Sequence, residues 1–92
     1  MNKKRDRLQI IHDILKAIQD RNGRIKPTHI LYKSNLSYQM LDDYMEELIT
    51  KGFIEVKTDK KNSRTYALTQ KGFEYVNKYH LIVDFVDSFG LN

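Results

Sequence analysis

The sequence predicts one α+β domain, mainly helical, in which a β-hairpin follows a pair of short helices and a long helix ends the chain. Three observations lead to it. Apolar residues recur at helical spacing, turn-type residues separate the segments, and residues 51–72 read as a helix stop, a strand, a basic turn, a second strand and a helix start. No internal repeat, low-complexity tract or linker divides the 92 residues.

The composition excludes several classes of protein. Hydrophobic residues make up 40% of the chain, and there is no cysteine for disulfides or thiolate metal sites. No run of about 18 apolar residues could cross a membrane, and the charged N-terminus lacks the apolar stretch of a signal peptide. We therefore expect a cytoplasmic protein without a membrane partner, in which residues 1–5 form a short basic arm.

An apolar stripe predicts the first helix. Isoleucines and leucines recur at helical spacing through residues 6–22, and Asn22 with Gly23 ends the helix. The next three residues, 24–26, are too few for more than a bridging strand.

A helix-turn-helix follows. Pro27 suits the first turn of a short helix that ends at Ser34, because its missing N–H would have no partner there anyway. Residues 35–36 make a tight turn. Ser37 then caps a helix that runs through Lys51, with its hydroxyl accepting from a free backbone N–H. Two helices joined by about three residues form a helix-turn-helix.

Residues 53–68 predict a basic β-hairpin. Gly52 suits the left-handed position just past a helix end, and strand-type residues flank the turn at 59–63. Thr69 can cap a last helix that reaches about Ser88. Four cations crowd the hairpin tip: Lys57, Lys60, Lys61 and Arg64.

Charge is distributed in blocks. Residues 1–33 hold nine Lys and Arg against three Asp, for a net charge of +6, and residues 57–71 hold five against one, for +4. The intervening residues 34–56 carry −4, and residues 72–92 carry −2. Basic blocks like these can converge on one face and attract a polyanion. The alternative is that they are solvated surface.

Motifs spread over most of the chain carry a resemblance to a known family. The most specific are the runs Lys26-Pro27-Thr28-His29-Ile30 and Tyr66-x-Leu68-Thr69-x-Lys71-Gly72. In this order and spacing, residues 5–80 resemble the small archaeal winged helix-turn-helix DNA-binding proteins. The resemblance implies that the hairpin is a wing, that residues 6–72 form the winged domain, and that double-stranded DNA is the partner. It also implies a homodimer formed by an antiparallel pair of C-terminal helices, residues 73–92.

The second helix of a helix-turn-helix enters the major groove with its N-terminal residues at the base edges. Gln39 is the best base reader here, because an amide can pair bidentately with adenine. Ser37 and Tyr38 could contact phosphate or base, although Ser37 also suits a cap and Tyr38 a surface position. If its acids lie on the outer face, this helix is a poor groove binder unless only its first turn enters, and weight shifts to phosphate contacts. The acids are Asp42, Asp43, Glu46 and Glu47.

Phosphate contacts are easier to assign than base contacts. Lys33 closes the second helix, Arg24 and Lys26 flank the short strand, and the wing can lay its cations along the backbone or in the minor groove. For each cation alone, a solvated side chain is the alternative. The expected DNA-binding cations are Arg24, Lys26, Lys33, Lys57, Lys60, Lys61 and Arg64.

The last helix carries a second signal. Phe73 and Val76 suit docking on the winged domain, while a separate apolar stripe has the 4, 3, 4, 3 spacing of a coiled-coil seam. The residues of this stripe are Tyr75, Tyr79, Ile82, Val86 and Phe89. We expect the stripe, together with Val83, to form a dimer interface. The alternative is that the helix folds back onto the first helix of its own chain.

Catalysis has little support. The three histidines, His12, His29 and His80, lack metal-ligand spacing, and no phosphate loop or nucleophile constellation is readable. We expect no enzyme, cofactor, metal or small-molecule ligand. The sequence predicts a dimeric, nucleoid-associated DNA-binding protein, either a transcriptional regulator or a small chromatin-type protein. The alternative is a winged-helix protein-interaction module that uses its acidic third helix.

Overall fold

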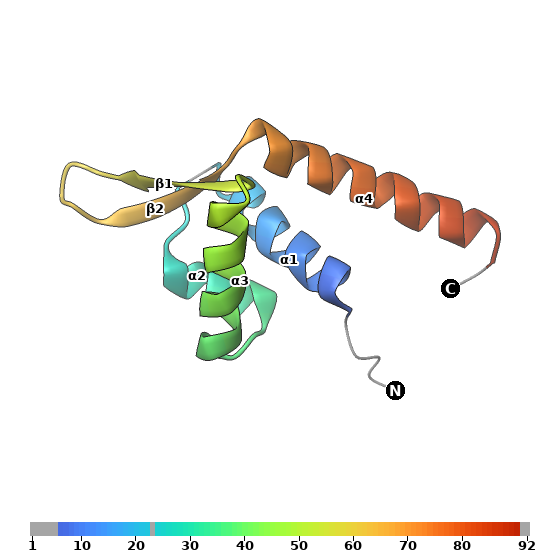
Figure 1. Ribbon diagram of the computed structural model, residues 1–92, viewed down its shortest axis with the longest axis horizontal. Helices are drawn as coiled ribbons and strands as arrows, with labels where there is room; N and C mark the ends of the chain where they lie inside the picture. The colour runs from blue at the N-terminus through green and yellow to red at the C-terminus, as the bar shows by residue number, and fades with distance from the viewer. Residues whose placement is uncertain (1–5, 23, 91–92) are drawn as a thin grey trace.

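The computed structural model describes residues 6–22 and 24–90, and of Ile82 it describes the backbone alone. Its elements are α1 (Arg7–Asp20), α2 (Pro27–Ser34), α3 (Tyr38–Thr50), β1 (Ile54–Thr58), β2 (Arg64–Leu68) and α4 (Gln70–Ser88) (Figure 1). This confirms the predicted α+β order. The basic arm at residues 1–5 lies outside the described residues.

The two strands form an antiparallel hairpin, called the wing below. Its register pairs Ile54 with Leu68 at the base and Thr58 with Arg64 near the tip. Ile25 adds the expected bridge, since its carbonyl accepts from the backbone N–H of Tyr66 at 3.2 Å. The segment between α1 and α2 is thereby fixed to the wing.

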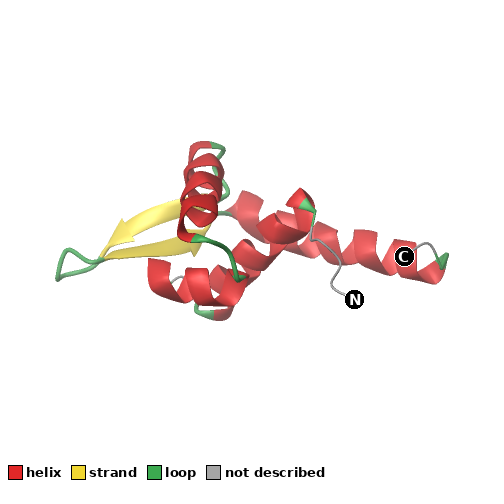
Figure 2. Ribbon diagram, turned by 90° about the horizontal axis from the view of Figure 1, so that it is seen from below, coloured by secondary structure: helices red, strands yellow, loops and turns green. Residues whose placement is uncertain are grey.

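The molecule is elongated, with principal extents of 49 × 28 × 21 Å. The wing projects from one end and the second half of α4 from the other, so they lie far apart along the long axis (Figures 1 and 2). The three helices α1, α2 and α3 form the body between them.

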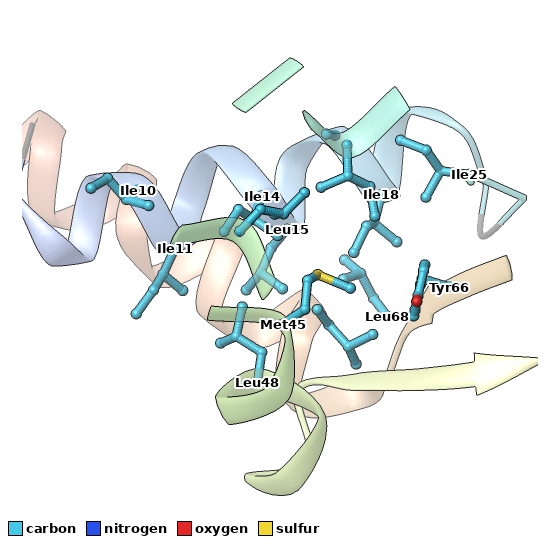
Figure 3. Packing of buried hydrophobic residues seen from close by; sticks show 14 of the residues in the cluster. Ile10, Ile11, Ile14, Leu15, Ile18, Ile25, Met45, Leu48, Tyr66 and Leu68 are labelled. Carbon is cyan, nitrogen blue, oxygen red and sulfur yellow. The ribbon is translucent and has the colours of Figure 1, made fainter. Parts of the chain in front are cut away.

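One apolar core joins the helices to the base of the wing. The stripe of α1 packs against Met45 and Leu48 of α3 and against Tyr66 and Leu68 of β2, as Figure 3 shows. Ile14, Leu15, Ile18, Ile25 and Ile30 are completely buried. Burial of each such side chain stabilises the fold by about 1.5–3 kcal/mol, which makes this core the main source of stability.

The predicted caps form as expected. Ser37 accepts from the Met40 N–H at 3.2 Å, and Thr69 accepts from the Gly72 N–H at 3.2 Å. Gly52 takes the expected left-handed conformation, with φ +83°. The expected end of the first helix involved Gly23, which lies outside the described residues.

The segment after the wing also fixes the C-terminal end of α3. Thr69 donates its hydroxyl proton to the Gly52 carbonyl at 2.6 Å, and Lys71 donates to the Lys51 carbonyl at 2.8 Å. The Lys71 ammonium also lies 4.5 Å from the centre of the Phe53 ring. These contacts explain the Leu-Thr-x-Lys-Gly run, and they give Lys71 a structural role in fixing the wing to α3.

Candidate nucleic-acid interface

The tip of the wing is an ordered turn built around one carboxylate. Asp59 accepts from the backbone N–H groups of Lys61 and Ser63, each at 2.9 Å, and Asn62 takes a left-handed conformation with φ +59°. These two N–H groups, that of Ser63 first, hold the pKa of the Asp59 carboxyl below its usual range. The Asp59 carboxylate therefore stabilises the turn, and Lys60 and Lys61 are exposed on that turn.

The remaining wing cations lie on opposite faces. Cross-strand partners in an antiparallel pair point to the same side, so Arg64 shares the face of Thr58 and Tyr66, which looks toward the helices. Lys57 lies on the other face, where its ammonium is 3.6 Å from the Glu55 carboxylate. The expected cluster is thus divided.

The first turn of α3 offers polar groups suited to bases. Tyr38 is 77% exposed. The Gln39 amide N–H donates to the Asp43 carboxylate at 3.0 Å, which leaves the Gln39 carbonyl and its second N–H to meet an adenine. Ser37 is the cap that the sequence predicts, with its oxygen engaged by the helix.

The four acids of α3 do not share one environment. Asp42, Asp43 and Glu46 are exposed, and the 100° turn per residue puts Asp43 and Glu46 on the outward face with Gln39. Glu47 is instead paired with Arg7 of α1 and, at 2.6 Å, with Lys51. The hydrogen bonds from Arg7 and Lys51 lower the pKa of Glu47 to about 2.

A groove joins the wing to both helices of the helix-turn-helix. Its volume is about 620 Å³, and it lies between the start of α2, the first two turns of α3 and the start of β2. Its floor is apolar and its edge toward the wing is basic. The floor consists of Ile30, Leu31, Leu41, Met45 and Tyr66, and the rim of Lys26, Pro27, Thr28, Tyr38, Asp42, Ser63 and Arg64.

The groove therefore brings together predicted residues from three elements. Lys26 precedes α2, Tyr38 opens α3 and Arg64 opens β2, and all three line it. Among the described residues, neither Lys26 nor Arg64 is in a salt bridge. Arg24 and Lys33 are exposed but are not among the lining residues.

Comparison with known proteins gives the chain a family. A family model described as "Winged helix-turn-helix" matches residues 4–86. The chain belongs to this winged helix-turn-helix family. Uncharacterized protein MJ0290 of Methanocaldococcus jannaschii is 38% identical over 69 residues, which are 75% of this chain but only 29% of that protein. This chain thus matches under a third of that archaeal relative.

Solved structures share the winged helix-turn-helix fold. Sso10a-2, a DNA-binding protein from Sulfolobus solfataricus, has a TM-score of 0.77 at 20% identity, covering 92% of this chain and 85% of that one. MepR, a transcription regulator of the Staphylococcus aureus multidrug efflux pump MepA, has a TM-score of 0.76 at 15% identity, covering 87% of this chain and 60% of that one. At these identities the likeness concerns the fold.

The long helix α4 of this winged helix-turn-helix chain divides into two halves. In the first half, Tyr75 donates its hydroxyl proton to the Leu8 carbonyl at 2.7 Å, and Tyr79 stacks on His12 with ring centroids 4.2 Å apart. Val76 is buried as expected, whereas Phe73 is 42% exposed. Two residues assigned to a dimer seam thus contact α1 of their own chain.

The second half of α4 extends past α1 and is largely uncovered. Leu81, Phe85 and Phe89 are each more than 60% exposed, and Phe85 and Phe89 contact each other with centroids 4.8 Å apart. Val83 is exposed and Val86 half-buried. The side chain of Ile82 lies outside the described part. A small winged helix-turn-helix domain rarely leaves such a continuous apolar surface without a partner.

Two residues that line the groove of the winged helix-turn-helix domain were not predicted as site residues from the sequence. Thr28 and Ser63 line the groove beside Lys26 and Arg64, yet neither belongs to a basic or apolar pattern. Thr28 lies in the Lys26–Ile30 run at the start of a helix, and Ser63 lies at the end of a turn, but neither signal indicates a contact with a ligand. Across residues 6–22 and 24–90, no three His, Asp or Glu side chains could hold a metal ion, and no helix is long and apolar enough to span a membrane.

Proposed function

We propose that this chain is a homodimeric protein that binds double-stranded DNA, chiefly through phosphate contacts from the wing. One observation carries the proposal. Lys26 and Arg64 come from separate elements to the same groove, beside the first turn of α3, and Lys60 and Lys61 extend this basic surface along an ordered tip. A phosphate strand passing between α3 and the wing meets these four cations.

The wing supplies more affinity than α3. The outward face of α3 carries Asp43 and Glu46, and a carboxylate placed near phosphates is repelled by them. Only the first turn, with Tyr38 and Gln39, suits entry into the major groove. Phosphate contacts position a protein on DNA, and base contacts give it sequence specificity. We therefore expect high affinity for duplex DNA with modest sequence preference.

The other expected cations have smaller parts. Lys33 and Arg24 can touch flanking phosphates because both are exposed. Lys57 contributes least, since it lies on the far face of the wing beside Glu55. The N-terminal arm can add contacts of the same kind.

The comparisons support a DNA-binding role. Sso10a-2 is a DNA-binding protein and MepR is a transcription regulator, and this chain shares their fold. The role is either transcriptional regulation or DNA packaging of the small chromatin-protein kind, acting on the nucleoid in the cytoplasm. A footprint on genomic DNA separates the two, because discrete protected sites mean a regulator and continuous coverage means a packager.

The dimer is proposed on the uncovered half of α4. Leu81, Val83 and Phe85 offer exposed apolar surface, and Ile82, Val86 and Phe89 continue the heptad spacing. A two-fold dimer presents two wings to nearby groove segments, and pseudo-palindromic sites follow. Ile82→Glu is expected to give a monomer by light scattering, whereas Lys78→Glu on the same helix leaves the dimer intact. A dimer that persists in Ile82→Glu argues against this seam.

Duplex binding tests the central proposal. Fluorescence anisotropy with a short duplex of random sequence is expected to show binding at about 50 mM salt and a loss of at least tenfold at about 200 mM. A chain that is folded and dimeric, yet binds no duplex at the lower salt concentration, contradicts it.

A second candidate function is favoured by the acids of α3. Asp43 and Glu46 lie on one exposed face, and a basic protein partner could bind there. Asp43→Asn with Glu46→Gln separates the two functions. The double variant is expected to bind duplex more tightly if DNA is the partner, and to lose its partner if that partner is a basic protein.

A further inference from the structure

We propose that the groove between α2, α3 and the wing is also a binding site for a small organic anion with an apolar body, such as an aromatic carboxylate. Its volume of about 620 Å³ falls within the range of about 300–1,000 Å³ usual for small-molecule sites. The consequence for DNA rests on the proposed function, but the binding itself does not.

The chemistry of the groove is divided along its length. Leu41 and Met45 of α3 and the half-buried Leu31 of α2 form an apolar floor that adjoins the core. These side chains are fixed by packing, so the floor is formed before any ligand arrives. An aromatic ring laid on it removes apolar surface from water without disturbing the fold.

The end of the groove toward the wing favours a ligand with a negatively charged group. Arg64 and Lys26 stand there, with the hydroxyls of Ser63 and Thr28 beside them. Arginine binds carboxylates bidentately, and Arg64 has no salt bridge within the described chain. Asp42 lies on the α3 side of the rim, so a compound with one charged end fits better than one charged at both ends.

A ligand in this groove competes with DNA. The groove is bordered by the first turns of α3 and by the start of β2, the two elements between which we place a phosphate strand. Its anionic group takes the same two cations, Arg64 and Lys26, that we assign to phosphate. The winged domain then needs no added ligand domain in order to respond to a metabolite.

The test uses 2-naphthoate as probe and neutral 2-naphthamide as its matched control, on the full chain without DNA. Titration followed by ¹⁵N amide shifts is expected to give a Kd on the order of 1 mM for 2-naphthoate, with the largest shifts at Thr28, Asp42 and Arg64. The amide should bind about tenfold more weakly. Equal binding of the two compounds, or no binding of 2-naphthoate, overturns the proposal.

Two variants locate the site and one serves as control. Arg64→Gln is expected to weaken 2-naphthoate binding about tenfold, and Thr28→Trp should block the groove from its rim. Lys57→Gln, on the far face of the wing, should leave binding unchanged. If Arg64→Gln and Thr28→Trp, folded by circular dichroism, bind 2-naphthoate as the unaltered chain does, the ligand lies elsewhere and the proposal is wrong.

A competition experiment separates this inference from the proposed function. With duplex bound, 2-naphthoate at several times its Kd should lower the apparent DNA affinity at least fivefold, and 2-naphthamide should not. If 2-naphthoate binds the groove but no duplex binds at any salt concentration, the proposed DNA function fails and the anion site stands. If duplex and 2-naphthoate bind together without competition, the regulatory role is refuted.

Discussion

Asp59 and Ser63 close the tip of the wing through two hydrogen bonds that run in opposite directions. The Asp59 backbone N–H donates to the Ser63 carbonyl at 3.0 Å, and the Ser63 backbone N–H donates to the Asp59 carboxylate at 2.9 Å. An acidic side chain thereby orders a basic tip. Lys60 and Lys61, between these two residues, are presented on a fixed turn.

Removing this carboxylate should loosen the tip. Asp59→Ala is expected to lower the ¹⁵N heteronuclear NOE of the Lys60 and Lys61 amides, because the N–H groups of Lys61 and Ser63 lose their acceptor. Asp59→Asn is the matched control, since its side-chain oxygen can still accept both bonds. A tip in Asp59→Ala as ordered as in the unaltered chain would show that Asp59 does not hold it.

The same contact has a pH dependence with a defined sign. The pKa of Asp59 is lowered on folding, so its contribution is complete above the ordinary aspartate pKa and is lost as the pH falls through the lowered value. The NOE of the tip amides should therefore fall in acid, below about pH 4.

Gly72 allows a close approach between α4 and the turn after α3. A methyl group there would lie 2.4 Å from the Phe53 carbonyl oxygen and 3.3 Å from Leu68. The oxygen belongs to the backbone and cannot rotate away, so Gly72→Ala should destabilise the fold by about 1–3 kcal/mol. Thermal unfolding measures this as a fall in Tm of several degrees.

Gly52 provides the comparison for Gly72. It has a left-handed φ of +83° but no atom within 4 Å of an added methyl group. Gly52→Ala should therefore cost only backbone strain, about 1 kcal/mol. An equal or smaller fall in Tm for Gly72→Ala than for Gly52→Ala would contradict the close packing of α4 on Phe53.

His12 should make the junction of α1 and α4 sensitive to acid. Its ring stacks on Tyr79, meets His80 edge-on with centroids 5.5 Å apart, and has a buried Nε2 without a hydrogen-bond partner in the described chain. Burial lowers the pKa of His12. The Asp13 carboxylate, 3.7 Å from the His12 Nδ1, opposes this shift, and His80 and, to a lesser extent, Lys16 add to it.

The sign of the His12 effect follows from that lowered pKa. The unfolded chain binds the proton more readily, so stability is complete above the ordinary histidine pKa of about 6.5 and is lost as the pH falls below it. His12→Phe keeps a stacking ring and cannot titrate, so its Tm should fall less between pH 7 and pH 5. His29→Gln, at an exposed position, should follow the unaltered chain. If the Tm of the unaltered chain, of His12→Phe and of His29→Gln depends on pH in the same way, His12 does not cause the acid sensitivity.

The local elements were predictable because local chemistry sets them. Pro27, Ser37, Gly52 and Thr69 belong to residue types that are favoured at helix starts and stops, and the apolar periods of α1 and α3 identify their buried faces. The hairpin followed from its turn residues. These signals lie within a few positions of the structure that they specify.

The site was less predictable because it depends on contacts distant in sequence. Glu47 looks like one more acid on α3 until Arg7, 40 residues away, pairs with it. Tyr75 fits a coiled-coil spacing, yet its hydroxyl donates a hydrogen bond to the carbonyl of Leu8, 67 residues away in the sequence. The groove needs the start of α2 and the start of β2 side by side, which no local pattern encodes.

The salt dependence of duplex binding tests the central claim most directly. For random duplex, each phosphate neutralised contributes about −0.9 to the slope of log K against log salt concentration. Replacing Lys60, Lys61 and Arg64 by Ala should make the slope shallower by about 0.9 for each cation removed and weaken binding to all sequences alike. Replacing Lys16 and Lys78, on α1 and α4, should leave it unchanged. A wing variant with the slope and affinity of the unaltered chain would contradict the account.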